Sequence, residues 1–206
     1  MKAKNIIILA VNEEPHPLEK LGGMMVEWLE GEGITDVFLT NDRTEIQKDL
    51  SKYDLFILAM TPRNIPEVEE NALVNFVRDG KKLMAIHSAT VVNKENLKYI
   101  DMIGAKLSHH PPYKEFTVKV ADVEHPIVEG VKDFKTKDEL YVLDRKPSDA
   151  RVLLTTFWEG SEQPMMYLKP YGKGEVLYNA LGHDLATFEN ASFRKLIIQG
   201  VKWLLR

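Results

Sequence analysis

Five of the six histidines in this chain are expected at or just beyond the carboxyl ends of predicted strands, or in the turns that follow: His16, His87, His109, His110 and His183. Imidazole transfers protons near neutral pH and is the commonest side-chain ligand of transition metals. In an open α/β sheet, the loops at the carboxyl ends of the strands converge and bind ligands. The placement of these residues therefore predicts a histidine-rich site at one edge of a sheet.

The segment Ala85-Ile86-His87-Ser88-Ala89 joins a predicted strand to a predicted helix. Several α/β enzymes hold a nucleophile on a tight turn at such a junction. His87 can act there as a base or a metal ligand, although it is a poor acyl acceptor. Ser88 is a candidate substrate contact, but capping of the following helix is the favoured interpretation of its hydroxyl.

Two further histidines lie in the proline-restricted loop His109-His110-Pro111-Pro112. Adjacent side chains usually point apart, so at most one of the pair is expected to face a shared site. His183 follows Gly182 at the end of a predicted strand, where the backbone can approach a ligand closely.

Asp138 and Glu139 are expected immediately before a short strand at 140–143. Strand alternation would place Glu139 and Tyr141 on one face and Asp138 and Leu140 on the other. On the histidine side, Glu139 would be a general base or a hard metal ligand. A solvated carboxylate at the sheet edge is the alternative.

The loop after the first predicted strand places His16 between two prolines. It carries no glycine, which argues against a dinucleotide at this position. The pair His125-Pro126 is expected to cap a turn rather than to bind a ligand. Gly172-Lys173-Gly174 predicts a hairpin turn, because it leads into a strand where a phosphate-binding loop would lead into a helix.

These residues need a scaffold, and the first half of the chain predicts one of alternating strands and helices. We expect strands at 5–11, 36–39, 54–59 and 82–86, with helices at 18–29 and 66–80 and a short helix between the second and third strands. This order predicts an α/β fold with a doubly wound, mostly parallel sheet. Short strands at 116–120, 140–143, 152–156 and 164–168 predict an antiparallel extension, before a strand at 175–181 and a last helix return to the main sheet. We expect a single domain over residues 1–206.

Composition excludes several classes of function. The net charge of −4 gives no reason to expect nucleic acid as a partner. The longest apolar run, near Ile6 to Val11, is too short for a membrane span or a signal peptide, so we expect no membrane partner and a cytoplasmic location. The chain has no cysteine, which excludes disulfides, thiolate metal ligands and a cysteine nucleophile.

Several motifs, taken together and in order, resemble the ThuA-like (trehalose utilisation) family of the class I glutamine amidotransferase-like superfamily. They are Ala85-Ile86-His87-Ser88-Ala89, Ile103-Gly104-Ala105, His110-Pro111, His125-Pro126-Ile127, Asp138-Glu139-Leu140-Tyr141, Gly172-Lys173-Gly174 and Ala180-Leu181-Gly182-His183. The resemblance implies a flavodoxin-like three-layer sandwich with a histidine in the cysteine position of the amidotransferases. It also implies a link to sugar catabolism, often beside oxidoreductases that make 3-keto-glycosides.

Three functional hypotheses follow. The first is an enzyme that acts on a sugar or a 3-keto-glycoside, with His87, His110, His183 and Glu139 in acid–base roles. The second is a metal-dependent hydrolase in which three of these four residues hold a divalent ion such as zinc or manganese. The third is a non-enzymatic member that binds a ligand or a partner protein.

The remaining candidates concern binding. We expect a small-molecule carbohydrate as the partner, contacted by His16, Ser88, His109 and Tyr141. Aromatic residues near the loops, Tyr113 among them, can stack on a sugar ring. A homodimer is compatible with the many apolar strands. Glutaminase activity is excluded, because there is no thiol.

Overall fold

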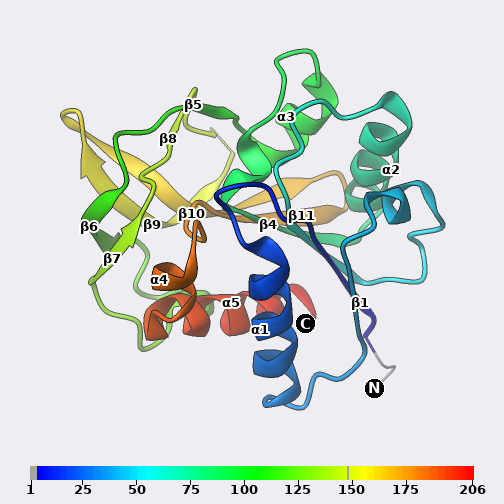
Figure 1. Ribbon diagram of the computed structural model, residues 1–206, viewed down its shortest axis with the longest axis horizontal. Coiled ribbons are helices and arrows are strands. Elements are labelled where there is room, and N and C mark those ends of the chain that lie inside the picture. The colour runs from blue at the N-terminus through cyan, green and yellow to red at the C-terminus, as the bar shows by residue number, and fades with distance from the viewer. Residues whose placement is uncertain (1–3, 148) are drawn as a thin grey trace.

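Continuous apolar runs form the centre of a nine-stranded sheet with the order β2-β1-β3-β4-β11-β10-β9-β6-β7 (Figure 1). The computed structural model describes residues 4–147 and 149–206. The parallel half consists of β2 (Val37–Thr40), β1 (Ile6–Ala10), β3 (Leu55–Ala59), β4 (Lys82–Ile86) and β11 (Gly174–Asn179). Strands β1 and β3 are buried along their whole length, as expected for parallel strands covered on both faces.

Helices cover both faces of this sheet, as Figure 1 shows, which confirms the predicted doubly wound sandwich. One layer contains α1 (Leu18–Glu30), α4 (Leu185–Phe188) and α5 (Ala191–Leu204), and the other contains α2 (Glu67–Arg78) and α3 (Leu97–Ile103). Helix α5 approaches the sheet closely at Gly200, where an added Cβ would lie 2.6 Å from Leu177 Cδ2. An added Cβ would displace the ends of the Leu177 and Met84 side chains, so the glycine allows this close helix–sheet packing.

The second half of the sheet is the predicted antiparallel extension. It consists of β10 (Ser161–Tyr171), β9 (Arg151–Trp158), β6 (Lys114–Val120) and β7 (Phe134–Asp138). The hairpin predicted at Gly172-Lys173-Gly174 is confirmed, because it connects the antiparallel pair β10 and β11. A separate two-stranded sheet pairs β5 (Leu107–His109) with β8 (Val142–Leu143).

The short helix predicted between β2 and β3 is present as a 3₁₀ helix, η1 (Arg43–Gln47). Two local predictions were wrong. The strand expected at 140–143 is reduced to β8, and an unpredicted strand, β7, ends at Asp138. Glu139 therefore follows a strand instead of preceding one.

The second wrong prediction concerns the turn after β4. Residues His87–Thr90 form a 3₁₀ helix, η2, without a side-chain cap. The hydroxyl of Ser88 is buried and forms no hydrogen bond with a described residue, so it does not cap the helix as expected. By contrast, Nδ1 of His125 accepts a hydrogen bond from the Ile127 amide at 3.2 Å and caps η3 (Pro126–Val128), as predicted.

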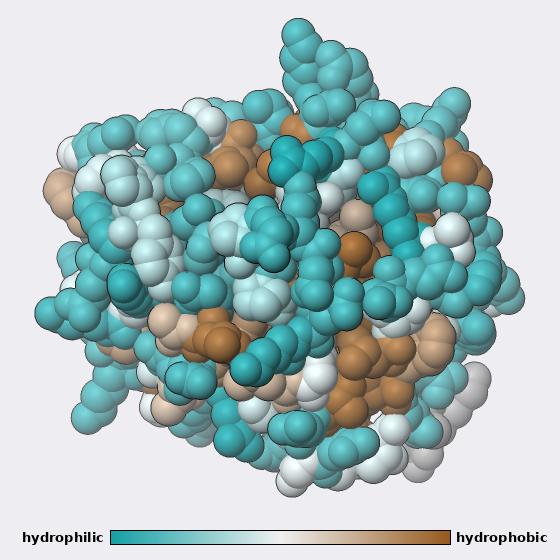
Figure 2. All heavy atoms as spheres, in the orientation of Figure 1, coloured by the Kyte–Doolittle hydropathy of each residue, from teal (hydrophilic) through white to brown (hydrophobic). Residues whose placement is uncertain are grey.

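Hydrophilic residues dominate the face of the molecule in Figure 2, with hydrophobic patches between them. Over residues 4–147 and 149–206, none of the helices has both the length and the hydrophobicity needed to cross a bilayer.

Candidate functional site

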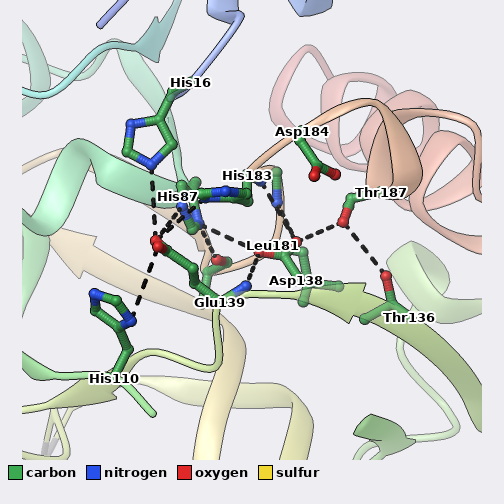
Figure 3. Close-up of polar contacts among 12 residues, drawn as sticks. His16, His87, His110, Thr136, Asp138, Glu139, Leu181, His183, Asp184 and Thr187 are labelled. Carbon is green, nitrogen blue, oxygen red and sulfur yellow. Dashed lines mark hydrogen bonds and ion pairs between the residues drawn. The ribbon is translucent and has the colours of Figure 1, made fainter. Parts of the chain in front are cut away.

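Four side chains from separate segments meet in one cluster: His16, His87, Glu139 and His183 (Figure 3). His16, His87 and His183 follow the parallel strands β1, β4 and β11, whose carboxyl ends share one edge of the sheet. Glu139 is brought to the same edge by the end of β7. Each residue offers one donor atom, and these four atoms lie within 4.8 Å of one another. We call this group the donor cluster.

The imidazole of His87 is held in one tautomer. Its Nδ1 lies 2.7 Å from the carbonyl oxygen of Ala180. A carbonyl can only accept a hydrogen bond, so Nδ1 carries a proton, and Nε2 presents a lone pair when the ring is neutral. Nε2 faces the donor cluster and lies 3.5 Å from Oε2 of Glu139.

The backbone of His87 adopts the tight turn expected between β4 and the helix. Its φ of +45° lies in the left-handed region, which is costly for a residue with a Cβ. The hydroxyl of Tyr178 donates to the His87 carbonyl oxygen at 3.0 Å and supports this turn. The predicted elbow is therefore present, with an imidazole at its tip.

The other two histidines reach the carboxylate of Glu139 from different directions. Nδ1 of His183 lies 3.2 Å from Oε2, and Nε2 of His16 lies 3.7 Å from the same oxygen. The rings of His16 and His183 meet edge to face, with centroids 4.8 Å apart. Gly182 turns His183 into the site with a φ of +128°, a conformation that favours glycine.

The electrostatics of the cluster centre on Glu139. Burial alone would raise the pKa of this carboxyl, but the contacts with His16, His183 and His87 outweigh burial and hold its pKa well below the usual range. Burial alone would lower the pKa of His183, and the neighbouring Glu139 raises it above its ordinary value. In the absence of another cation, the carboxylate therefore favours the protonated form of His183.

His110 and Tyr113 lie at the rim of the donor cluster. His110 is exposed, and its Nδ1 lies 3.9 Å from Oε1 of Glu139. The same Nδ1 lies 3.0 Å from the carbonyl oxygen of Pro111, so it carries the proton and leaves Nε2 as a base. The ring of Tyr113 lies 5.1 Å from that of His183, and its hydroxyl donates to Asp184 at 2.5 Å.

The remaining predicted site residues lie elsewhere. The ring of Tyr141 is buried and stacks on His87 at 4.2 Å, so it packs behind the imidazole. His109 is exposed and contacts Glu159 at 3.4 Å rather than Glu139. Ser88 is completely buried beside His87.

Asp138 was not among the predicted site residues, although it is fully buried directly beside the cluster. Burial raises its pKa, and this effect outweighs the hydrogen bonds that favour its charged form. Its position next to Glu139 was the sequence signal for a role, but the sequence did not show that β7 ends there.

The chemistry of the donor cluster fits a divalent metal ion. Nε2 of His16, Nε2 of His87 and Nδ1 of His183 are buried and have no hydrogen-bond partner within the described residues. Each of the three nitrogens instead faces Oε2 of Glu139, at 3.7, 3.5 and 3.2 Å respectively, and three imidazole nitrogens around one carboxylate oxygen are the arrangement of a ligand set. Imidazole and carboxylate are ligands of zinc, manganese and iron, and the Ala180 bond that orients His87 is typical of metal-bound histidine.

Comparison with known families identifies the chain. The family model for ThuA, trehalose utilisation, matches residues 8–204. The chain belongs to the ThuA family. A search of curated proteins found no match to this ThuA protein.

Solved structures share its fold. A ThuA-like protein from Parabacteroides merdae ATCC 43184 has a TM-score of 0.83 at 20% identity, with 100% of this chain and 90% of that chain covered. A ThuA-like protein from Bacteroides uniformis ATCC 8492 has a TM-score of 0.82 at 16% identity, with 99% and 93% covered. A β-galactosidase from Bacillus circulans sp. alkalophilus has a TM-score of 0.71 at 13% identity, and the match covers 98% of this chain but 30% of that chain.

These comparisons confirm the predicted resemblance and fold class. Membership of the ThuA family supports a carbohydrate-related role. At identities this low, the solved structures establish the architecture alone, so the chemistry of this ThuA protein has to be argued from its donor cluster.

Proposed function

We propose that this protein is a metal-dependent enzyme of carbohydrate catabolism, with a divalent ion held by the donor cluster and His110 as the proton-transfer group. The observation that carries the proposal is the convergence of three unpartnered imidazole nitrogens on the Glu139 carboxylate. The orienting bond from His87 to Ala180 supports it, because that bond fixes the tautomer that a metal requires.

The donor set favours one kind of ion. Four protein ligands complete the tetrahedron that zinc prefers, whereas six-coordinate ions such as manganese keep positions for other ligands. We therefore favour manganese or a similar ion over zinc. Bound in the cluster, such an ion would act as a Lewis acid towards the oxygens of a sugar.

A 3-keto-glycoside is the proposed substrate class, because its carbonyl acidifies the C–H bond at C2. Nε2 of His110 takes the C2 proton, and the electrons of that bond form a C1=C2 double bond. The C1–O bond breaks, and the leaving oxygen keeps its electron pair and takes a proton from the imidazolium of His110. The exposure of His110 and the fixed proton on its Nδ1 support this role.

Tyr113 is proposed to contact the sugar. Its ring is partly buried beside His183, and Asp184 holds its hydroxyl, so the orientation of the ring is fixed. A fixed aromatic face beside a polar cluster suits stacking on a sugar ring.

The test has two stages, performed on untagged protein purified without chelator. Elemental analysis and thermal shift should show a bound divalent ion and stabilisation by added Mn²⁺, and both should be lost in His183→Ala. The loaded protein should then convert a 3-keto-glucoside to an enone, detected by its ultraviolet absorbance. A wild-type protein that binds no divalent ion overturns the metal proposal, and a loaded protein inert on keto-glycosides overturns the proposed substrate class. Release of the intact keto-sugar without an enone would instead identify a hydrolase.

A further inference from the structure

Asp138 connects the segments that carry the donor residues. Its Oδ2 accepts hydrogen bonds from the Gly182 amide at 2.9 Å and the Thr187 hydroxyl at 2.7 Å. Its Oδ1 accepts one from the amide of Glu139 at 2.7 Å, and the amide of His183 lies 3.5 Å from Oδ2. As Figure 3 shows, one carboxylate thus joins the end of β7, the loop after β11 and helix α4.

Asp138 also contacts the third donor segment. Its Oδ1 lies 3.8 Å from Nδ1 of His87, the nitrogen that carries a proton and donates to Ala180. A carboxylate at this distance stabilises the proton on Nδ1 of His87. It thereby holds the ring in its orientation and makes Nε2 more basic. Three of the four residues in the donor cluster are therefore in direct contact with Asp138.

The charge of the site is unbalanced without a cation. In the part of the chain that the structure describes, no lysine or arginine forms an ion pair with Asp138 or Glu139, and all their ion-pair contacts are with histidines. The amides of Gly182, Glu139 and His183 can only donate hydrogen bonds, so the Asp138 oxygens that face them are acceptors. Buried carboxylates need a compensating charge, and metal ligation requires neutral imidazoles. The Glu139 carboxylate beside neutral imidazoles matches a divalent ion.

We propose that Asp138 is a positioning residue for the metal centre, which holds the Glu139 and His183 segments in place through its hydrogen bonds. This inference rests on the proposed metal site and extends it to a residue that is not itself a ligand. Partners that hydrogen-bond to metal ligands commonly change metal affinity by about 10- to 100-fold when they are removed.

The substitution Asp138→Asn tests this role, because it replaces one acceptor oxygen with a donor amide at nearly constant volume. The affinity of the folded protein for Mn²⁺, measured by isothermal titration calorimetry, should fall about 10- to 100-fold. The visible absorption bands of the Co²⁺-loaded protein should also shift, because the ligands move. Asp133→Asn is the matched control: this carboxylate accepts a hydrogen bond from the Val120 amide at 2.9 Å, and an asparagine can accept the same bond. It should leave both measurements unchanged.

A second variant covers the case in which Asp138→Asn fails to fold. Thr187→Val removes one hydrogen bond to Asp138 and leaves every charge in place. We expect a smaller loss of Mn²⁺ affinity and a shifted Co²⁺ spectrum. A merely structural role for Asp138 would lower the stability of the metal-free protein and leave the affinity of the folded protein unchanged.

The outcomes separate this inference from the proposed function. If folded variants bind Mn²⁺ as the wild type does, with the same Co²⁺ spectrum, the role of Asp138 is refuted and the metal site stands. If the wild type itself binds no divalent ion, both proposals fail.

Discussion

Nδ1 of His183 lies 3.2 Å from Oε2 of Glu139, the shortest of the contacts between this carboxylate and the imidazoles around it. The same pair can hold either a proton or a metal ion between its two atoms. The two occupants compete, and this competition has measurable consequences.

Divalent-ion affinity should rise with pH. The pKa of His183 lies above its ordinary value of 6.5, because Glu139 outweighs the effect of burial, so a proton must leave before a metal binds. Mn²⁺ titrations between about pH 5.5 and pH 8 should show increasing affinity, since pH 5.5 and pH 8 bracket the ordinary range of histidine. A flat profile would contradict the assignment of His183 as a ligand.

In the metal-free protein, the contribution of His183 to the free energy of unfolding should decrease as the pH rises. A raised pKa in the folded state contributes stability that is fully present below pH 6.5 and is lost as the pH rises through the folded-state pKa. Urea unfolding of the chelator-treated protein, compared with His183→Gln at each pH, isolates this contribution. The stability difference should shrink towards alkaline pH.

His125 should make the stability of the protein sensitive to acid. Burial, followed by the charge of Arg151, lowers its pKa below 6.5, so the unfolded chain binds the proton more readily. Its contribution is present above pH 6.5 and is lost as the pH falls through the folded-state pKa. The variant His125→Asn keeps an acceptor for the Ile127 amide but cannot take up the proton. Its free energy of unfolding should therefore fall less between about pH 7.5 and pH 5.5 than that of the wild type. This window extends about one unit on either side of the ordinary histidine pKa. Equal slopes in the two proteins would rule this contribution out.

His110→Gln should separate proton transfer from metal binding. The exposed imidazole is outside the donor cluster, so the thermal shift with Mn²⁺ should remain. Turnover of a keto-glycoside should fall in kcat by about 10²- to 10⁴-fold, the usual contribution of a general base. His109→Gln is the matched control, because the neighbouring histidine contacts Glu159 instead. Loss of activity in both variants would indicate damage to the loop rather than loss of a base.

Gly182→Ala should disturb both the fold and the site. Its φ is +128°, and an added Cβ would lie 2.8 Å from Cγ2 of Ile86. We expect a loss of about 1–3 kcal/mol in the free energy of unfolding, together with weaker Mn²⁺ binding. Gly160→Ala provides the comparison, because Gly160 also has a positive φ but has no atom within 4 Å of the added Cβ. It should cost less stability and leave Mn²⁺ binding intact.

The parallel half of the fold could be predicted because its strands are apolar throughout. Strand β7 could not, because its sequence, Phe134-Lys135-Thr136-Lys137-Asp138, places polar Thr136 and Asp138 on its buried face. Hydrophobic alternation, the main signal for a strand, is therefore absent. The polar character of that face is explained by the site, since Asp138 is buried to reach the segments around it.

The sequence predicted the edge of the sheet at which the histidines gather, but not which of them belong to the donor cluster. His16 and His110 were both expected in loops at this edge, yet the donor cluster includes His16 and leaves His110 at the rim. The distance between loops depends on how the strands are ordered in the sheet and on how far each side chain reaches. Neither can be obtained from the spacing of residues along the chain.

The four donor residues are far apart in the sequence, and this separation links the site to the completion of folding. Residues 16, 87, 139 and 183 meet only after β1, β4, β7 and β11 have all taken their places. A partly folded chain therefore lacks the site, and an ion bound there selects the complete native state. At a free concentration of about 100 times Kd, such an ion would add about 2.7 kcal/mol to the free energy of unfolding. In the cell, the availability of the metal would then influence how much of this protein survives proteolysis.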